Sequence, residues 1–112
     1  MTVPQLNRSL TLLTPVQAPD DAGGLITSWV SLGVLWAEMK PASTRETTGF
    51  AGPVSKAAYK ITVRAAATGS PRRPKAGQRF TIGTRQFEVE TVVERDLDGR
   101  YLTCLCKEEV AS

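Results

Sequence analysis

Histidine is absent from this sequence of 112 residues, and its only cysteines are Cys104 and Cys106. Histidine is the commonest general base in enzymes, so a nucleophile in this chain would depend on a lysine or a carboxylate for its activation. A zinc site built from nitrogen and sulfur ligands would need two more ligands than one chain supplies. We therefore expect no catalytic residues, no enzymatic activity, no metal site and no cofactor.

The two cysteines are separated by a single residue. On a β-strand this spacing sets both sulfurs on one face, without the geometry that a relaxed disulfide needs. We predict that both are buried free thiols.

Long apolar runs and a strong net charge are also missing. The apolar stretches are too short to span a bilayer, and the N-terminus has no basic region followed by an apolar segment. Fourteen basic and eleven acidic residues give a net charge of only +3, which is compatible with nearby nucleic acid but defines no binding face. We expect a soluble, cytoplasmic protein with no membrane partner, forming one domain over residues 1–112.

Apolar and polar residues alternate with a period of two in most of the chain, and no helical apolar stripe continues beyond about two turns. The alternation predicts six strands, at residues 8–16, 25–39, 59–64, 79–82, 86–94 and 100–107. The expected fold is all-β: a small antiparallel β-barrel or sandwich of about six strands with one long mobile loop.

The predicted strands are separated by residues that favour turns. Residues 19–24 combine Asp20 and Asp21 with two glycines and predict a hairpin connection, in which the carboxylates bond their own backbone rather than a cation. Glycines in residues 83–84 and 98–99 predict two further hairpins. Gly33 is expected to mark a bend or bulge in a long strand, and Pro41 is expected to end that strand.

Two segments lack a sustained period. Residues 42–57 form a long polar loop, and loops of this length in compact domains are usually functional. We expect this loop to be disordered in the free chain. Residues 69–77 form an exposed, proline-rich hairpin that carries Arg72, Arg73 and Lys75. These cations are candidates for facing DNA, although the hairpin lacks interleaved aromatic residues and a solvated tip is the alternative.

Trp29 and Trp36 lie seven residues apart in the second predicted strand. On a regular strand, residues at this spacing point to opposite faces, so at least one of them is expected in the core. The other is a candidate anchor at a protein interface, because exposed tryptophan is enriched at protein contacts.

Several short motifs follow one another in a fixed order along most of the chain. They are Arg8 with Leu10 and Leu12, the turn containing Asp21, Gly23 and Gly24, then Trp29, residues 36–39, Arg45-Glu46, residues 59–64 and residues 77–82. In this order they resemble the head-tail joining, or head-completion, family of tailed phages and gene transfer agents, whose members are often called stoppers. The resemblance covers roughly residues 8 to 108.

The resemblance implies a small β-barrel with a long loop, which assembles as a ring between the DNA-filled head and the tail. Its implied partners are copies of itself in a six- or twelve-fold ring, the portal adaptor protein, the tail terminator or tail tube protein, and packaged double-stranded DNA. Its implied location is the host cytoplasm during assembly and then the head-tail junction of the virion.

The resemblance also suggests which residues act in the ring. The loop tends to face the channel, so Arg45, Glu46, Phe50 and Lys56 would line or plug the DNA exit. The flanks of the barrel would carry ring and tail contacts, and Trp29, Trp36 and Glu38 are the candidate interface residues.

Two alternatives remain open. One is a tail-terminator or tail-completion ring protein of the same particle. The other is a barrel that binds single-stranded nucleic acid. Such a barrel needs several stacking rings on one face of the sheet, whereas the aromatic residues Tyr59, Phe80, Phe87 and Tyr101 occur singly among aliphatic residues.

Overall fold

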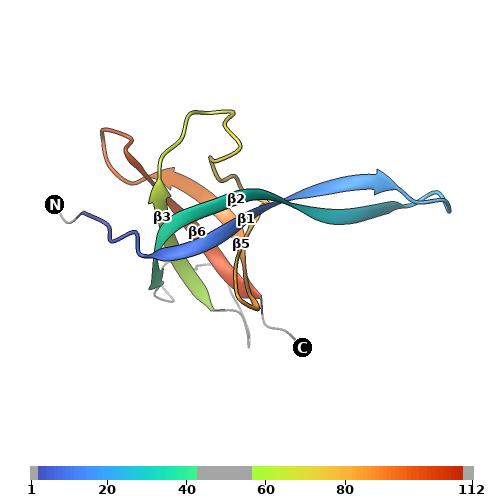
Figure 1. The fold of residues 1–112 in the computed structure, drawn as a ribbon, viewed down its shortest axis with the longest axis horizontal. Helices are drawn as coiled ribbons and strands as arrows, with labels where there is room; N and C mark the ends of the chain where they lie inside the picture. Colours follow the sequence, from blue (N-terminus) through green and yellow to red (C-terminus); the bar gives the residue numbers. More distant parts are fainter. Residues whose placement is uncertain (1–2, 43–56, 110–112) are drawn as a thin grey trace, which may run out of the picture.

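The computed structural model describes residues 3–42 and 57–109. Six strands form one antiparallel sheet: β1 (Arg8–Pro19), β2 (Leu25–Pro41), β3 (Ala58–Arg64), β4 (Arg79–Ile82), β5 (Arg85–Glu94) and β6 (Tyr101–Glu109). The strand order is β1-β2-β3-β6-β5-β4, and β4 pairs with β1, so the sheet closes on itself (Figure 1). The all-β prediction is confirmed, with a closed sheet rather than a sandwich. No helix in the described part of the chain is long and apolar enough to cross a membrane.

The interior of the closed sheet is filled from every strand. Alternate residues face inward, as the period-two pattern predicts. The core consists of Leu10, Leu12, Leu35, Ala37, Ile61, Val63, Phe80, Phe87, Val89, Leu102, Cys104 and Cys106. Tyr59 packs its ring edge-to-face on Phe87, with 5.3 Å between the ring centroids. Both cysteines are free and buried on the inner face of β6, which confirms the prediction for them.

A β-bulge divides β2 into two parts. Leu12 pairs with Gly33 while the next residue of β1, Leu13, pairs with Ser31, so Leu32 is an extra residue in β2. Gly33 adopts a φ of 122°, which side chains with a Cβ rarely tolerate. The bulge predicted at Gly33 is therefore confirmed.

Beyond the bulge, β1 and β2 leave the barrel as a two-stranded arm, which we define as residues 13–31. The pairing of β1 with β4 ends at Leu13, and the pairing of β2 with β3 begins only at Ala37. The strands of the arm therefore pair only with each other, and Figure 1 shows them projecting away from the rest of the sheet. β1 continues three residues beyond its predicted end, because Pro15 and Pro19 are tolerated in an arm whose outer edges are unpaired.

The tip of the arm is a tight turn organised by Asp20. Its Oδ1 accepts hydrogen bonds from the backbone N–H groups of Ala22 at 2.9 Å and Gly24 at 2.7 Å. Gly23, with a φ of 85°, supplies the left-handed conformation between them. The turn predicted for residues 19–24 is confirmed.

The other connections agree only in part with the prediction. Gly83 and Gly99 lie in the hairpins that join β4 to β5 and β5 to β6, as expected. Residues 69–77 do not form a hairpin, because β3 and β4, the strands on either side of this segment, are not neighbours in the sheet. The segment is a crossover loop anchored by buried Pro74. Pro41 is the last residue of β2, as predicted.

Burial of the two cysteines should make stability depend on alkaline pH. Desolvation raises the pKa of the Cys104 thiol from 9.0 to about 12, and it also raises the pKa of Cys106. The folded chain keeps these protons at a pH where the unfolded chain has lost them. We therefore expect the free energy of unfolding, measured by urea denaturation, to fall as the pH rises from 9.0 toward about 12.

The control for this prediction is the double variant Cys104→Ala/Cys106→Ala. Its stability should be lower at neutral pH, because the deletions leave space in the core, but should fall less steeply with rising pH. Equal slopes for the two proteins would contradict the assignment of the pH dependence to these thiols.

Candidate assembly surfaces

The two tryptophans lie on the same face of the β1–β2 ladder, and neither belongs to the core. Trp36 pairs with Ser9 and Trp29 pairs with Pro15, and these partners are an even number of residues apart on the uninterrupted strand β1. The prediction of opposite faces is wrong, because the extra residue at the bulge reverses the alternation of β2 between the two positions. The expectation that at least one tryptophan is in the core is wrong for the same reason.

The environments of the two tryptophans differ. Trp36 is 59% exposed on the outside of β2. Trp29, at the base of the arm, is half-buried beneath the guanidinium of Arg79, which lies 4.0 Å from the centroid of the indole ring. Trp36 is thus the more accessible of the two, whereas Trp29 helps to fix the arm to the barrel through a cation–π contact.

Glu38, the third candidate interface residue, is engaged within the chain. Its carboxylate accepts a hydrogen bond from the backbone N–H of Gln5 at 2.8 Å. It also forms ion pairs with Arg95 at 3.5 Å and Lys40 at 3.8 Å. The first of these contacts joins the N-terminal segment to β2, and Glu38, Lys40 and Arg95 are among the residues that line a groove of about 420 Å³. Its predicted part in an interface stays a prediction.

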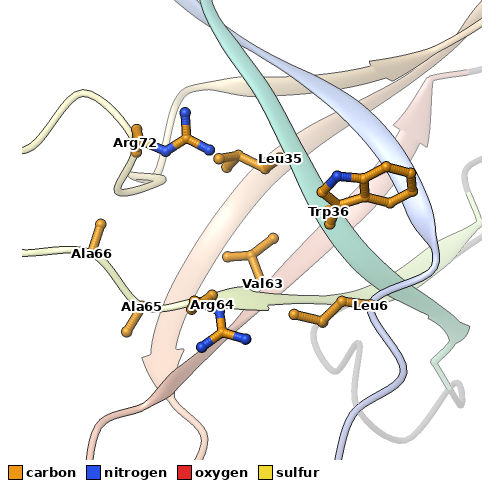
Figure 2. Close-up of a pocket in the computed structure, with 8 residues that line it drawn as sticks. All are labelled: Leu6, Leu35, Trp36, Val63, Arg64, Ala65, Ala66 and Arg72. Carbon is orange, nitrogen blue, oxygen red and sulfur yellow. The ribbon is translucent and has the colours of Figure 1, made fainter.

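A pocket of about 370 Å³ opens where β2 separates from β3 on its way to the arm. Its lining is apolar except for two arginines, and Figure 2 shows the side chains around it: Leu6, Leu35, Trp36, Val63, Arg64, Ala65, Ala66 and Arg72. Leu35 and Val63 belong to the barrel core, and exposed Trp36 stands at the edge. The sequence gives no sign of this pocket, because its lining comes from segments that are far apart along the chain.

The three basic residues predicted to face DNA make different contacts in the structure. The Arg72 guanidinium donates a hydrogen bond to the carbonyl oxygen of Val34 at 3.3 Å and so lies across β2 beside the pocket. Arg73 instead donates to the carbonyl oxygen of Ala66 at 2.9 Å, within the crossover loop. Lys75 is exposed. Their contact with DNA stays a prediction.

The candidate channel residues Arg45, Glu46, Phe50 and Lys56 lie outside the described residues. The residues that flank them are held side by side. The backbone N–H of Ala42 donates to the carbonyl oxygen of Ala58 at 2.9 Å, and that of Glu108 donates to the carbonyl oxygen of Ala57 at 2.8 Å. The described residues on either side of the gap, Ala42 and Ala57, therefore lie at the same end of the barrel.

That end of the barrel carries an ion-pair network that the sequence analysis missed. Arg85 forms two hydrogen bonds with the Glu108 carboxylate, from Nε at 2.7 Å and from Nη2 at 3.0 Å. It also donates to the hydroxyl of Tyr59 at 3.1 Å, and Arg79 pairs with Glu109 at 2.9 Å. The hydrogen bonds from Arg85 lower the pKa of Glu108. No local sequence pattern pairs residues this far apart.

Comparisons with known proteins match almost the whole chain. The family model described as phage head completion protein matches residues 1–109. A chain in the structure titled "Virion of native gene transfer agent (GTA) particle" is 41% identical, with a TM-score of 0.78, covering 98% of this chain and 100% of that chain. The solution structure of protein SF1141 from Shigella flexneri 2a is 21% identical and shares the fold, with a TM-score of 0.71 and full coverage of both chains. None of the curated proteins matches.

Replacing Arg85 by glutamine should weaken the end of the barrel. The expected loss is about 1 kcal/mol in the free energy of unfolding, since water screens a partly exposed ion pair. Because the pKa of Glu108 is lowered in the folded state, the pair stabilises the fold above the carboxyl's ordinary pKa of 4.5 and loses this effect as the pH falls. Urea denaturation at neutral and acidic pH should therefore show a smaller difference between wild type and Arg85→Gln in acid.

The matched control for Arg85→Gln is Lys40→Gln. Lys40 has a side chain that is 61% exposed and an ion pair of 3.8 Å, so its replacement should change stability little. Equal losses in the two variants would contradict a special contribution from Arg85.

Proposed function

This chain belongs to the phage head completion protein family, and we propose that it works as a ring-forming stopper that closes the DNA-filled head and joins it to the tail. The observation that carries the proposal is the likeness, over 98% of the chain, to a chain of an assembled gene transfer agent virion. The proposed work is structural, and we assign no catalytic step to any residue.

The distribution of exposed apolar residues supports work in an assembly. Four exposed apolar side chains lie along the arm: Val16, Leu25, Ile26 and Val30. A two-stranded arm has no core of its own in which to bury them. The register places Val16, Ile26 and Val30 on one face of the arm and Leu25 on the other. Several exposed apolar side chains on one face commonly mark a site of protein contact. Neighbouring subunits of a ring would cover such side chains. The barrel would offer these neighbours a rigid, preformed surface to bind.

We assign the partners by their positions around such a ring. The portal adaptor protein would contact one side, the tail terminator or tail tube protein the other, and packaged double-stranded DNA would pass through the centre. Assembly would take place in the host cytoplasm before the subunit enters the virion. Arg45, Glu46, Phe50 and Lys56 remain the candidate channel residues of this proposal.

The nucleic-acid-binding alternative loses support from the positions of the aromatic rings. Phe80 and Phe87 are fully buried. Tyr59 packs on Phe87 and bonds to Arg85 through its hydroxyl. These rings are part of the barrel's own packing, so they do not form a platform on which bases could stack.

Deletion of the gene in cells that produce the particle tests the proposal. Electron microscopy should show heads that are empty or leaking, beside free, complete tails, and a plasmid copy of the gene should restore joined particles. Tails of irregular length would instead indicate the tail-terminator alternative. Normal tailed particles in the deletion strain would overturn the proposal.

A further inference from the structure

The tip of the arm combines an acidic group with exposed apolar side chains. Leu25 is 66% exposed and Ile26 is 53% exposed. Next to them in the turn, Asp21 is exposed, while its neighbour Asp20 is bound to the backbone of the turn. Within the described residues, Asp21 has no ion-pair partner. The tip therefore carries a branched aliphatic side chain on each face of the arm, together with a carboxylate that has no ion-pair partner among the described residues.

The pocket between β2 and β3 has the complementary character. Leu6, Leu35 and Val63 form an apolar floor, and the guanidinium groups of Arg64 and Arg72 stand at its edge (Figure 2). Arg64 is exposed, and no ion pair joins it to another of the described residues. If the tip occupied the pocket, its aliphatic side chains would contact the apolar floor, and its carboxylate would lie near the guanidinium groups. A cavity of about 370 Å³ is within the range of sites that bind small groups.

The tip cannot occupy the pocket of its own chain. Leu25 at the tip and Leu35 at the pocket are ten positions apart on β2. At the rise of an extended strand the two lie about 30 Å apart, and the arm points away from the barrel (Figure 1). The complementary surfaces can therefore meet only between two copies.

We propose that the arm tip of one copy docks into the pocket between β2 and β3 of the next copy. The contact joins two different surfaces, so it is head-to-tail and leaves one tip and one pocket free at the ends of any open chain of copies. Such a contact closes into a ring when the rotation between copies permits. This inference rests on the proposed ring and identifies the surfaces that form it. Trp36, exposed at the edge of the pocket, is the residue that would anchor the incoming tip.

Site-directed cross-linking tests the contact in the full-length protein. Ala22→Cys places a thiol at the tip and Ala66→Cys places one in the pocket, whereas the two native cysteines are buried and will not react. Mixing the two variants with a short bismaleimide should give a cross-linked dimer. One chain carrying both substitutions should give a ladder of larger oligomers, since a head-to-tail contact continues from copy to copy.

The matched control replaces the pocket cysteine by Thr91→Cys. Thr91 is exposed on β5, which lies three strands from β2 in the closed sheet. A cross-link to Ala22→Cys no stronger at position 66 than at position 91 would overturn the proposal and point to a different occupant of the pocket.

Charge reversal tests the predicted complementarity. Asp21→Arg in the tip variant should lower the cross-linking yield roughly tenfold, because like charges then meet at the pocket. Arg64→Glu in the pocket variant should restore most of that loss. Both positions are exposed, so we expect urea denaturation to show unchanged folding. Loss without restoration would overturn the pairing of Asp21 with Arg64.

Complementation of the deletion strain separates this inference from the proposed function. Plasmid-borne Asp21→Arg should fail to restore joined particles, and Asp21→Arg/Arg64→Glu should restore them. Full restoration by Asp21→Arg alone would overturn the docking contact, while the head-closing function would still stand on the phenotype of the deletion.

Discussion

The closure of the sheet depends on a short pairing between β1 and β4, which covers only Thr11 to Leu13 of β1. Here β1 lies between two neighbours, and the side chains of Leu12 and Phe80 meet inside the barrel. β4 begins at Arg79, the partner of Leu13, so β1 has no neighbour on that side beyond Leu13. Whatever follows Leu13 on β1 must leave the barrel. The residue at which β4 begins thus marks where the barrel ends and the arm begins.

The same division gives the molecule two kinds of surface. The barrel residues bury their apolar side chains against each other, and the ion pairs of Arg79 and Arg85 link its last strands. The arm residues have no opposite layer to pack against, and the separation of β2 from β3 opens a pocket on the barrel itself. One departure from the closed sheet therefore produces both a projection and a hollow. These are the two shapes that a repeating head-to-tail contact requires.

Much of the fold could be predicted because the alternation of apolar and polar residues is a local property of each strand. The turn at Asp20, the bulge at Gly33 and the buried cysteines were predictable for the same reason, since each depends on the conformational preference of a few adjacent residues. The faces of Trp29 and Trp36 were predicted wrongly, because the prediction counted along a regular strand and left out the extra residue that the bulge places between them. The pocket and the Arg85–Glu108 pair depend on which strands become neighbours, and the local pattern of residues in each strand does not reveal that.

The prolines of the arm affect the tendency of the free chain to aggregate before it is incorporated into a particle. A paired ribbon with unoccupied edges and apolar side chains is the kind of segment that recruits further strands and grows into aggregates. Pro15 and Pro19 interrupt the row of backbone donors along the β1 edge, because proline has no N–H group. The interrupted edge disfavours the addition of further strands, so newly made chains can remain unaggregated until they bind their partners.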